Sequence, residues 1–148
     1  MRLEAASSWA QEEGLSDIIG HVDARNRPLV LLSILGEEDA FPVIVDSGFN
    51  GELLLHDDAI IRHRCELTGL NEPIELADKA SRLLMVARAQ IIWFGQSRGV
   101  DVLIGTTQSS RAATADEPIG LLGTRLLSPH KLKVDFASRR VVISESKE

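Results

Sequence analysis

Short apolar runs separated by turn residues are the feature that most limits how this chain can fold. They begin at Asp17, in the stretch DIIGHVDARNRPLVLLSILGEEDAFPVIVDSGF. Runs of this length, bounded by Gly, Pro, Asn and Asp, are typical of strands joined in hairpins. We place the first two connections at residues 25–28 and 36–39. Neither intervening segment has room for a crossover helix, so an antiparallel arrangement is expected here.

One short helix interrupts the strand pattern. Asp57 or Asp58 can cap it and place an acid in its first turn, and we expect it to end near Gly69. Beyond it the pattern resumes in the following segments: two strands within 71–95 that meet at a tip at 78–81, the second running to Phe94; a strand at 100–105; a polar loop at 106–118; a helical turn at about 124–128; and two strands split by 137–138. The expected class is all-β, a small barrel or sandwich with one or two short helices.

The length of 148 residues indicates one domain, because a chain of this size forms a single ordinary core. We expect a polar extension at 1–15 and the domain at 16–148. The formal net charge of −6 argues against nucleic acid and anionic membranes as partners, since both require a basic surface.

Targeting and metal signals are lacking in the sequence. The first 15 residues contain several glutamates and no continuous apolar core, so they do not resemble a secretory signal or an anchor. No apolar run reaches membrane-spanning length, and a cytoplasmic protein is expected. Cys65 is the single cysteine, and no Cys/His spacing indicates zinc. We therefore expect no disulfide, no metal and no organic cofactor.

Two glycine-terminated apolar runs carry the functional signal. In FPVIVDSGFNGELLLH the run at 41–45 leads into Asp46-Ser47-Gly48, and about 75 residues later IGLLG ends at Gly123. An isolated Asp-Ser-Gly is common in surface turns, so the tripeptide by itself decides little. The apolar approach and the later glycine require a further explanation.

Together these motifs resemble the retropepsins, the aspartic peptidases of the retroviral type. The resemblance is closest to a prokaryotic branch marked by Asp-Thr-Gly-Phe, matched here by Asp46-Ser47-Gly48-Phe49. It covers roughly residues 18–143 and rests on four segments in the same order: GHVDARNRPLV, IVDSGFNGELLL, LLGTRLL and LKVDF. The resemblance implies an acid-protease fold, a partly closed barrel with one lobe per chain.

The same resemblance implies an aspartic endopeptidase with Asp46 as its catalytic residue. Two carboxyl groups at close range cannot both ionise, because their negative charges repel. They therefore share one proton, so that one serves as acid and the other as base. This chain has one such motif, so the second carboxylate would come from another copy, in a homodimer that cleaves a peptide or protein substrate.

Neighbouring residues receive supporting roles from the resemblance. Ser47 would hold the two active-site loops together, and Gly48 would bring its backbone close to the carboxylate. Three further residues would support the loop from behind: Leu121, Leu122 and Gly123. A flap would close over the substrate, with Ala77, Asp78, Lys79 and Ala80 at its tip.

Alternative readings use the same residues. The fold could serve a dimeric peptide-binding or assembly module without hydrolysis, or Asp46 could lie in an exposed turn of a monomer. His56 and His63 lack a third ligand at a characteristic spacing, so a surface helix is the preferred interpretation. Cys65 is interpreted as a half-buried core residue, because His63 would lie on another face of a helix.

Overall fold

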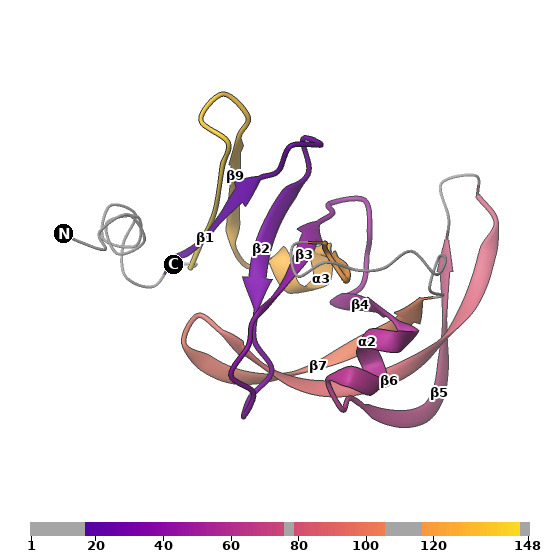
Figure 1. Ribbon diagram of the computed structural model, residues 1–148. Coiled ribbons are helices and arrows are strands. Elements are labelled where there is room, and N and C mark those ends of the chain that lie inside the picture. The colour runs from indigo at the N-terminus through magenta and orange to yellow at the C-terminus, as the bar shows by residue number, and fades with distance from the viewer. Residues whose placement is uncertain (1–16, 76–78, 106–116, 146–148) are drawn as a thin grey trace.

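The computed structural model describes residues 17–75, 79–105 and 117–145. This part of the chain forms ten strands and two short helices, and Figure 1 shows how they are arranged. In chain order they are β1 (Ile18–Val22), β2 (Pro28–Leu32), β3 (Phe41–Val45), β4 (Leu53–His56), α2 (Asp57–Arg62), β5 (Glu66–Glu75), β6 (Ser81–Trp93), β7 (Gln96–Gly105), β8 (Gly120–Leu122), α3 (Thr124–Leu127), β9 (Lys131–Asp135) and β10 (Arg140–Ser144). The expected all-β class is confirmed.

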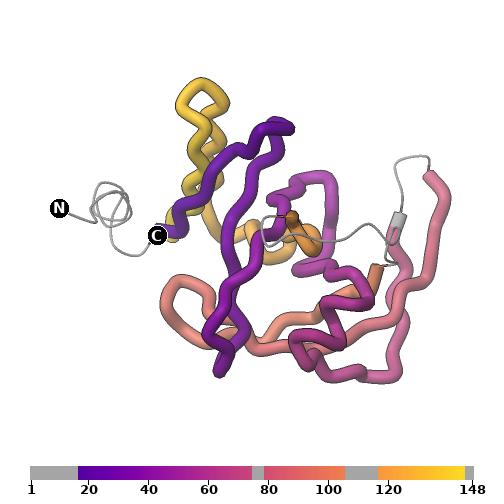
Figure 2. Tube along the Cα trace, viewed as in Figure 1, coloured from indigo at the N-terminus to yellow at the C-terminus, as the bar shows by residue number. Residues whose placement is uncertain are grey.

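The ten strands form one mixed sheet in the order β5-β6-β7-β4-β8-β3-β2-β1-β10-β9. The pairs β3–β8 and β4–β7 are parallel. The expected antiparallel arrangement of β1, β2 and β3 is confirmed, because β2 pairs antiparallel with both of its neighbours. The end strands β5 and β9 do not pair with each other, so the sheet is not closed into a barrel. The connection after β2 nevertheless crosses β6 (Figure 2), where Ile92 N–H donates to the Ser33 carbonyl at 3.0 Å.

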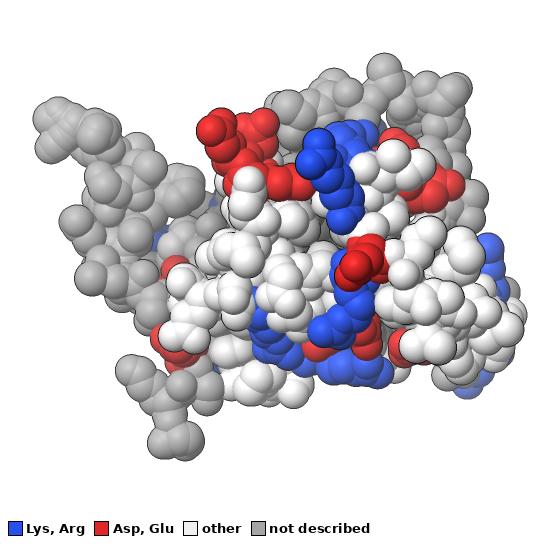
Figure 3. All heavy atoms as spheres, turned by 90° about the horizontal axis from the view of Figure 1, so that it is seen from below, with Lys and Arg blue, Asp and Glu red and all other residues white. Residues whose placement is uncertain are grey.

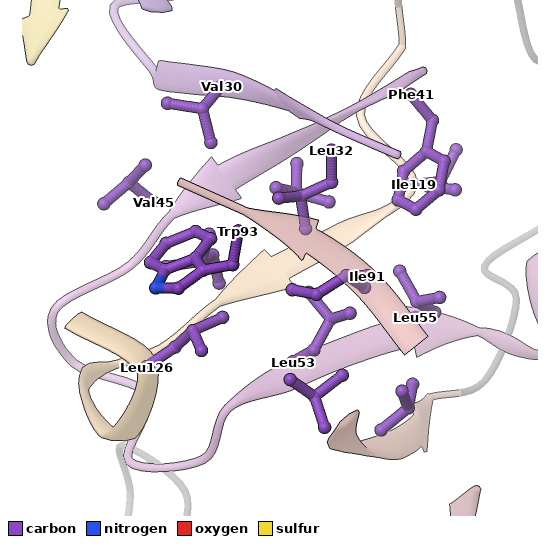
Figure 4. Close-up of a cluster of buried hydrophobic side chains, with 14 of the residues drawn as sticks. Val30, Leu32, Phe41, Val45, Leu53, Leu55, Ile91, Trp93, Ile119 and Leu126 are labelled. Atoms are coloured by element: carbon purple, nitrogen blue, oxygen red, sulfur yellow. The ribbon is translucent and has the colours of Figure 1, made fainter. Parts of the chain in front are cut away.

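The main hydrophobic core is formed by side chains from both halves of the sheet, with β2 and β3 in one half and β4 and β6 in the other (Figure 4). Alternation along the strands selects its members: in β4, Leu53 and Leu55 are fully buried while Leu54 between them is half-buried. Figure 4 labels ten of the core residues: Val30, Leu32, Phe41, Val45, Leu53, Leu55, Ile91, Trp93, Ile119 and Leu126. Each large side chain removed from water here stabilises the fold by about 2 kcal/mol.

A second, smaller cluster lies apart from the main core. Its buried members are Phe49, Leu84, Val86 and Leu103, and three half-buried residues pack against them: Leu54, Ile74 and Leu121. We call this set the hairpin cluster, because β5 and β6 form a long antiparallel hairpin that supplies several of its members. The hairpin cluster adds apolar contacts to the backbone pairing of β6 with β7, through which the hairpin joins the rest of the sheet.

The helix after β4 is shorter than the sequence suggests. It ends at Arg62 instead of near Gly69, and its N-cap is His56, which makes no side-chain cap, while Asp57 and Asp58 lie in the first turn. Arg64 adopts a left-handed conformation, with φ of 56°, and this stops the helix. The following residues, Glu66–Glu75, pair with β6 instead, so the segment expected to finish the helix begins a strand.

Most other strand boundaries follow the expected turns, but β7 begins at Gln96 and not at residue 100, because it pairs with β6 directly after the turn at 94–95. Strands β9 and β10 lie on either side of residues 137–138, as expected, and α3 matches the expected helical turn. The second hairpin strand ends at Trp93 rather than Phe94, because Phe94 and Gly95 form a two-residue turn with φ of 52° and 79°. The extension at 1–15 and nearly all of the loop expected at 106–118 lie outside the described residues.

Strand β5 forms one end of the sheet and is irregular. Its register with β6 shifts between Leu67 and Asn71, Gly69 has a φ of 81°, and Pro73 interrupts its run of backbone N–H groups. Leu67 and Leu70 are both exposed.

Among the described residues, no helix is long and apolar enough to cross a membrane.

Candidate functional site

Asp46 stands at the first position after the buried strand β3. Its N–H donates to the Leu122 carbonyl at 2.9 Å, which fixes where the strand ends. The chain then turns: Gly48 N–H donates to Asp46 Oδ1 at 2.9 Å, and Phe49 N–H donates to the Asp46 carbonyl at 3.1 Å. We call residues 46–49 the Asp46 turn. It holds a half-buried carboxylate by its own backbone, with Ser47 and Gly48 exposed.

The chain that follows β8 lies directly behind this turn. Strand β8 sits between β3 and β4, parallel to the first and antiparallel to the second. Three backbone hydrogen bonds then tie the two segments together: Gly123 N–H to the Glu52 carbonyl at 3.0 Å, Thr124 N–H to the Phe49 carbonyl at 2.8 Å, and Arg125 N–H to the Gly51 carbonyl at 3.1 Å. The turn therefore rests on a hydrogen-bonded support.

Gly123 is required by the closeness of these two segments. A Cβ at this position would lie 2.4 Å from the Gly51 carbonyl oxygen and 2.6 Å from both the carbonyl oxygen and Cδ2 of Phe49. Its φ of −109° suits any residue, so lack of space and not backbone conformation demands glycine. The two residues before it differ: Leu122 is fully buried in the main core, while Leu121 is half-buried beside the hairpin cluster.

Polar side chains around the turn add contacts that the sequence patterns do not reveal. Thr124 Oγ1 donates to the Phe49 carbonyl at 3.3 Å and lies 3.4 Å from Asn50 Oδ1, so this link is uncharged. Glu52, whose side chain is 12% exposed, accepts hydrogen bonds from Arg98 Nη2 at 3.1 Å and from Asp101 N–H at 2.8 Å. These contacts join strands far apart in sequence, and residue spacing carries no signal for them.

Charges elsewhere on the surface are mixed. Arg88 and Asp101, on neighbouring strands β6 and β7, form an ion pair at 2.6 Å. Figure 3 shows basic and acidic side chains beside each other on one face, among a larger uncharged area. Among the described residues of that face, basic side chains lie next to acidic ones.

The residues expected to form a flap tip, 77–80, belong to the connection between β5 and β6. Ala77 and Asp78 lie outside the described residues, and Lys79 and Ala80 are exposed just before β6, with Lys79 at φ of 72°. The base of the hairpin contributes Leu84 and Val86 to the hairpin cluster, which also contains Phe49 of the Asp46 turn. The structure thus brings the hairpin and the turn together through apolar packing.

The alternative metal and thiol sites are not assembled. Within the described ranges, no three His, Cys, Asp or Glu side chains are grouped so that they could hold a metal ion. His63 is buried instead, with Nδ1 2.8 Å from Glu37 Oε1 and its ring 4.6 Å from that of Phe41. Cys65 is half-buried beside the core, as expected; burial, and secondarily the Glu37 carboxylate, raise the pKa of its thiol and disfavour the nucleophilic form.

Comparison with known proteins identifies the fold. No family model matches the chain, and no curated protein matches it in sequence. Its structure is similar to the crystal structure of a retropepsin-like aspartic protease from Rickettsia conorii, with a TM-score of 0.58 over 87% of this chain and 90% of that one, at 16% identity. This chain has a retropepsin-like fold.

A second solved structure overlaps less closely. The EIAV protease complexed with the inhibitor HBY-793 matches with a TM-score of 0.48 at 17% identity, covering 72% of this chain and 89% of that chain.

Proposed function

We propose that this protein is an aspartic endopeptidase that acts as a homodimer through paired Asp46 carboxylates. One observation carries the proposal: in a retropepsin-like fold, the Asp46 carboxylate is held at the end of a buried strand by the Gly48 N–H, 2.9 Å away. The chain contains one Asp-Ser-Gly. A second carboxylate therefore has to come from a second copy.

The proposed mechanism follows from the chemistry of two carboxylates a few ångströms apart. They hold one proton between them, because mutual repulsion prevents both from being charged. The charged carboxylate accepts a proton from water as that water attacks the peptide carbonyl carbon, while the protonated one donates to the carbonyl oxygen. The proton taken from water then passes to the leaving amine nitrogen as the C–N bond breaks, and a hydroxyl of the tetrahedral intermediate returns its proton to the other carboxylate, which restores the singly protonated pair. The reaction needs no cofactor.

The surrounding residues would serve this reaction in distinct ways. Ser47 is exposed and can donate its hydroxyl proton to the backbone of the second copy, which would hold the two turns at a fixed separation. The Gly48 N–H keeps the Asp46 carboxylate oriented. The tip of the β5–β6 hairpin would close over a bound peptide and exclude bulk water from the carboxylates.

The test is cleavage of a diverse peptide library between about pH 4 and pH 8. Wild type, Asp46→Asn and the control Asp39→Asn, which changes an exposed aspartate in another connection, are assayed side by side. Light scattering of the same samples should give about twice the chain mass of 16.2 kDa. We expect turnover by wild type and Asp39→Asn only, with all three proteins folded and dimeric.

Mixing the proteins tests whether both carboxylates are needed. If one Asp46 is insufficient, random exchange with an equal amount of Asp46→Asn should reduce activity per wild-type chain to about one half. Unchanged activity would contradict the paired mechanism. A verified wild-type dimer that cleaves nothing would instead favour a peptide-binding or assembly module on the same fold.

A further inference from the structure

Phe49, the last residue of the Asp46 turn, connects Asp46 to the segment that supports the turn. Its N–H donates to the Asp46 carbonyl at 3.1 Å, while its own carbonyl accepts from Thr124 N–H at 2.8 Å and from Thr124 Oγ1 at 3.3 Å. The backbone of this one residue is thus bonded both to the turn that holds the carboxylate and to the start of α3. Any displacement of Phe49 must alter one or both of these connections.

The ring of Phe49 is held by two glycines. It is 8% exposed, and the Cβ positions that would be occupied at Gly51 and Gly123 lie 2.6 Å from its Cζ and Cδ2 atoms. A side chain at either glycine would occupy the space of the ring. The ring therefore fits a slot formed by backbone on both sides, and its direction is restricted more strongly than that of a side chain surrounded by flexible neighbours.

The other side of the ring belongs to the hairpin cluster. The other buried members of that cluster are Leu84 and Val86 of β6 and Leu103 of β7, and the half-buried residues packed against it are Leu54 of β4, Ile74 of β5 and Leu121 of β8. The main core lies elsewhere, so the apolar contact between turn and hairpin depends on this small group. A side chain in a small cluster has few substitutes, and its loss should uncouple the parts that it joins.

A second link between the same regions is electrostatic. Arg125 Nη2 lies 3.6 Å from Glu72 Oε2, which connects α3 to β5. Both side chains are substantially exposed, 53% for Arg125 and 31% for Glu72, so solvent screens their attraction. The apolar contact through Phe49 is therefore the stronger of the two links.

We propose that Phe49 is a positioning residue that couples the Asp46 turn to the β5–β6 hairpin. When the hairpin packs on the hairpin cluster, the ring is fixed and the Gly48 N–H stays on the Asp46 carboxylate. When the hairpin lifts, the ring loses the apolar cover of Leu84 and Val86 and keeps only the neighbours that lie outside the hairpin, so the turn loosens. The coupling is a property of the fold; its effect on catalysis rests on the proposed function.

Amide hydrogen exchange tests the coupling without requiring activity. We compare Phe49→Ala and the milder Phe49→Leu with Leu32→Ala, which shortens a buried side chain of the main core, at 2% exposure. In Phe49→Ala, amides of the turn (46–49) and of the hairpin strand (84–86) should both exchange at least about tenfold faster than in Leu32→Ala, after correction for global stability. Phe49→Leu should lie between wild type and Phe49→Ala.

A change on the hairpin side supplies the reciprocal test. Val86→Ala leaves the turn untouched in sequence, yet it should speed exchange at 46–49 when Phe49 is present and add little in the Phe49→Ala background. If Phe49→Ala does not fold, Phe49→Leu and Val86→Ala still decide the matter. The coupling is overturned if the Phe49 variants affect the turn no more than Leu32→Ala does, or if Val86→Ala leaves the turn unchanged.

Activity measurements extend the test to positioning. In an active wild type, Phe49→Ala should reduce kcat at least about tenfold with less than about a twofold change in KM, and Phe49→Leu should recover part of the loss. Equal losses in Leu32→Ala would refute the positioning role. Fast exchange together with an inactive wild type would leave the coupling established and reject the proposed function instead.

Discussion

Replacement of Gly123 by alanine should destabilise the protein through one identifiable contact. The new Cβ would lie 2.4 Å from the Gly51 carbonyl oxygen. Ordinary van der Waals contact begins near 3.4 Å, so that oxygen and the loop that carries it must retreat by about 1 Å. The Phe49 carbonyl must move as well, because it lies 2.6 Å from the same position.

The magnitude follows from what this movement disrupts. Overpacking of a tight site costs about 1–3 kcal/mol. The two displaced carbonyls accept the N–H groups of Thr124 and Arg125, and each hydrogen bond lost removes about 1 kcal/mol more. A total near 3–4 kcal/mol should lower Tm by roughly 10 °C in a domain of this size.

The assay is urea unfolding at a fixed protein concentration, with Gly36→Ala as the matched control. Gly36 has a φ of 89° and an open space around its Cβ position, so alanine there introduces backbone strain without a clash, at a cost of about 1–2 kcal/mol. If Gly123→Ala is no less stable than Gly36→Ala, the close approach behind the Asp46 turn is not a steric requirement.

Three further predictions concern other parts of the fold. Leu122→Ala should cost about 3 kcal/mol in urea unfolding because Leu122 is fully buried, and the half-buried Leu121→Ala clearly less; equal costs would contradict the two environments. Burial lowers the pKa of His130 from its ordinary 6.5, and Trp93 Nε1–H donates to its unprotonated Nε2 at 3.2 Å. The unfolded chain therefore binds a proton at His130 more readily than the folded chain, so the free energy of unfolding should fall as the pH drops below about 6.5. The fall should be larger in wild type than in His130→Asn, and parallel pH profiles would refute this. Cys65 should alkylate more slowly than a free peptide thiol, since burial and Glu37 raise its pKa; Glu37→Gln should speed the reaction slightly, and full reactivity in wild type would contradict the placement.

The strands could be predicted from the sequence because local chemistry marks their ends. Glycine and charged residues at 36–39 and the turn at 137–138 interrupt apolar runs, and these interruptions are visible without knowledge of the fold. The end of helix α2 was not predictable in this way. A helical spacing of apolar residues, at Ile60, Ile61 and Cys65, extends past the observed end of the helix at Arg62. The helix ends earlier because Glu66–Glu75 pair with β6, and that pairing depends on a distant strand.

The candidate site shows the same division. The apolar run before Asp46 and the glycine at 123 are sequence patterns, and they lead to the turn and its support. The burial of Phe49 in the hairpin cluster and the contact of His63 with Glu37, 26 residues away, are tertiary contacts. No local pattern specifies them, because either ring could equally lie on the surface of its own segment.

The irregular strand β5 has a consequence for how the protein behaves at high concentration. An end strand with exposed leucines is normally a template on which another chain can add a strand and begin a fibre. Here the register shift between Leu67 and Asn71 breaks the straight row of backbone donors and acceptors, and Pro73 removes one donor altogether. The irregularities that make this hairpin uneven thus protect the open edge of the sheet from uncontrolled self-association.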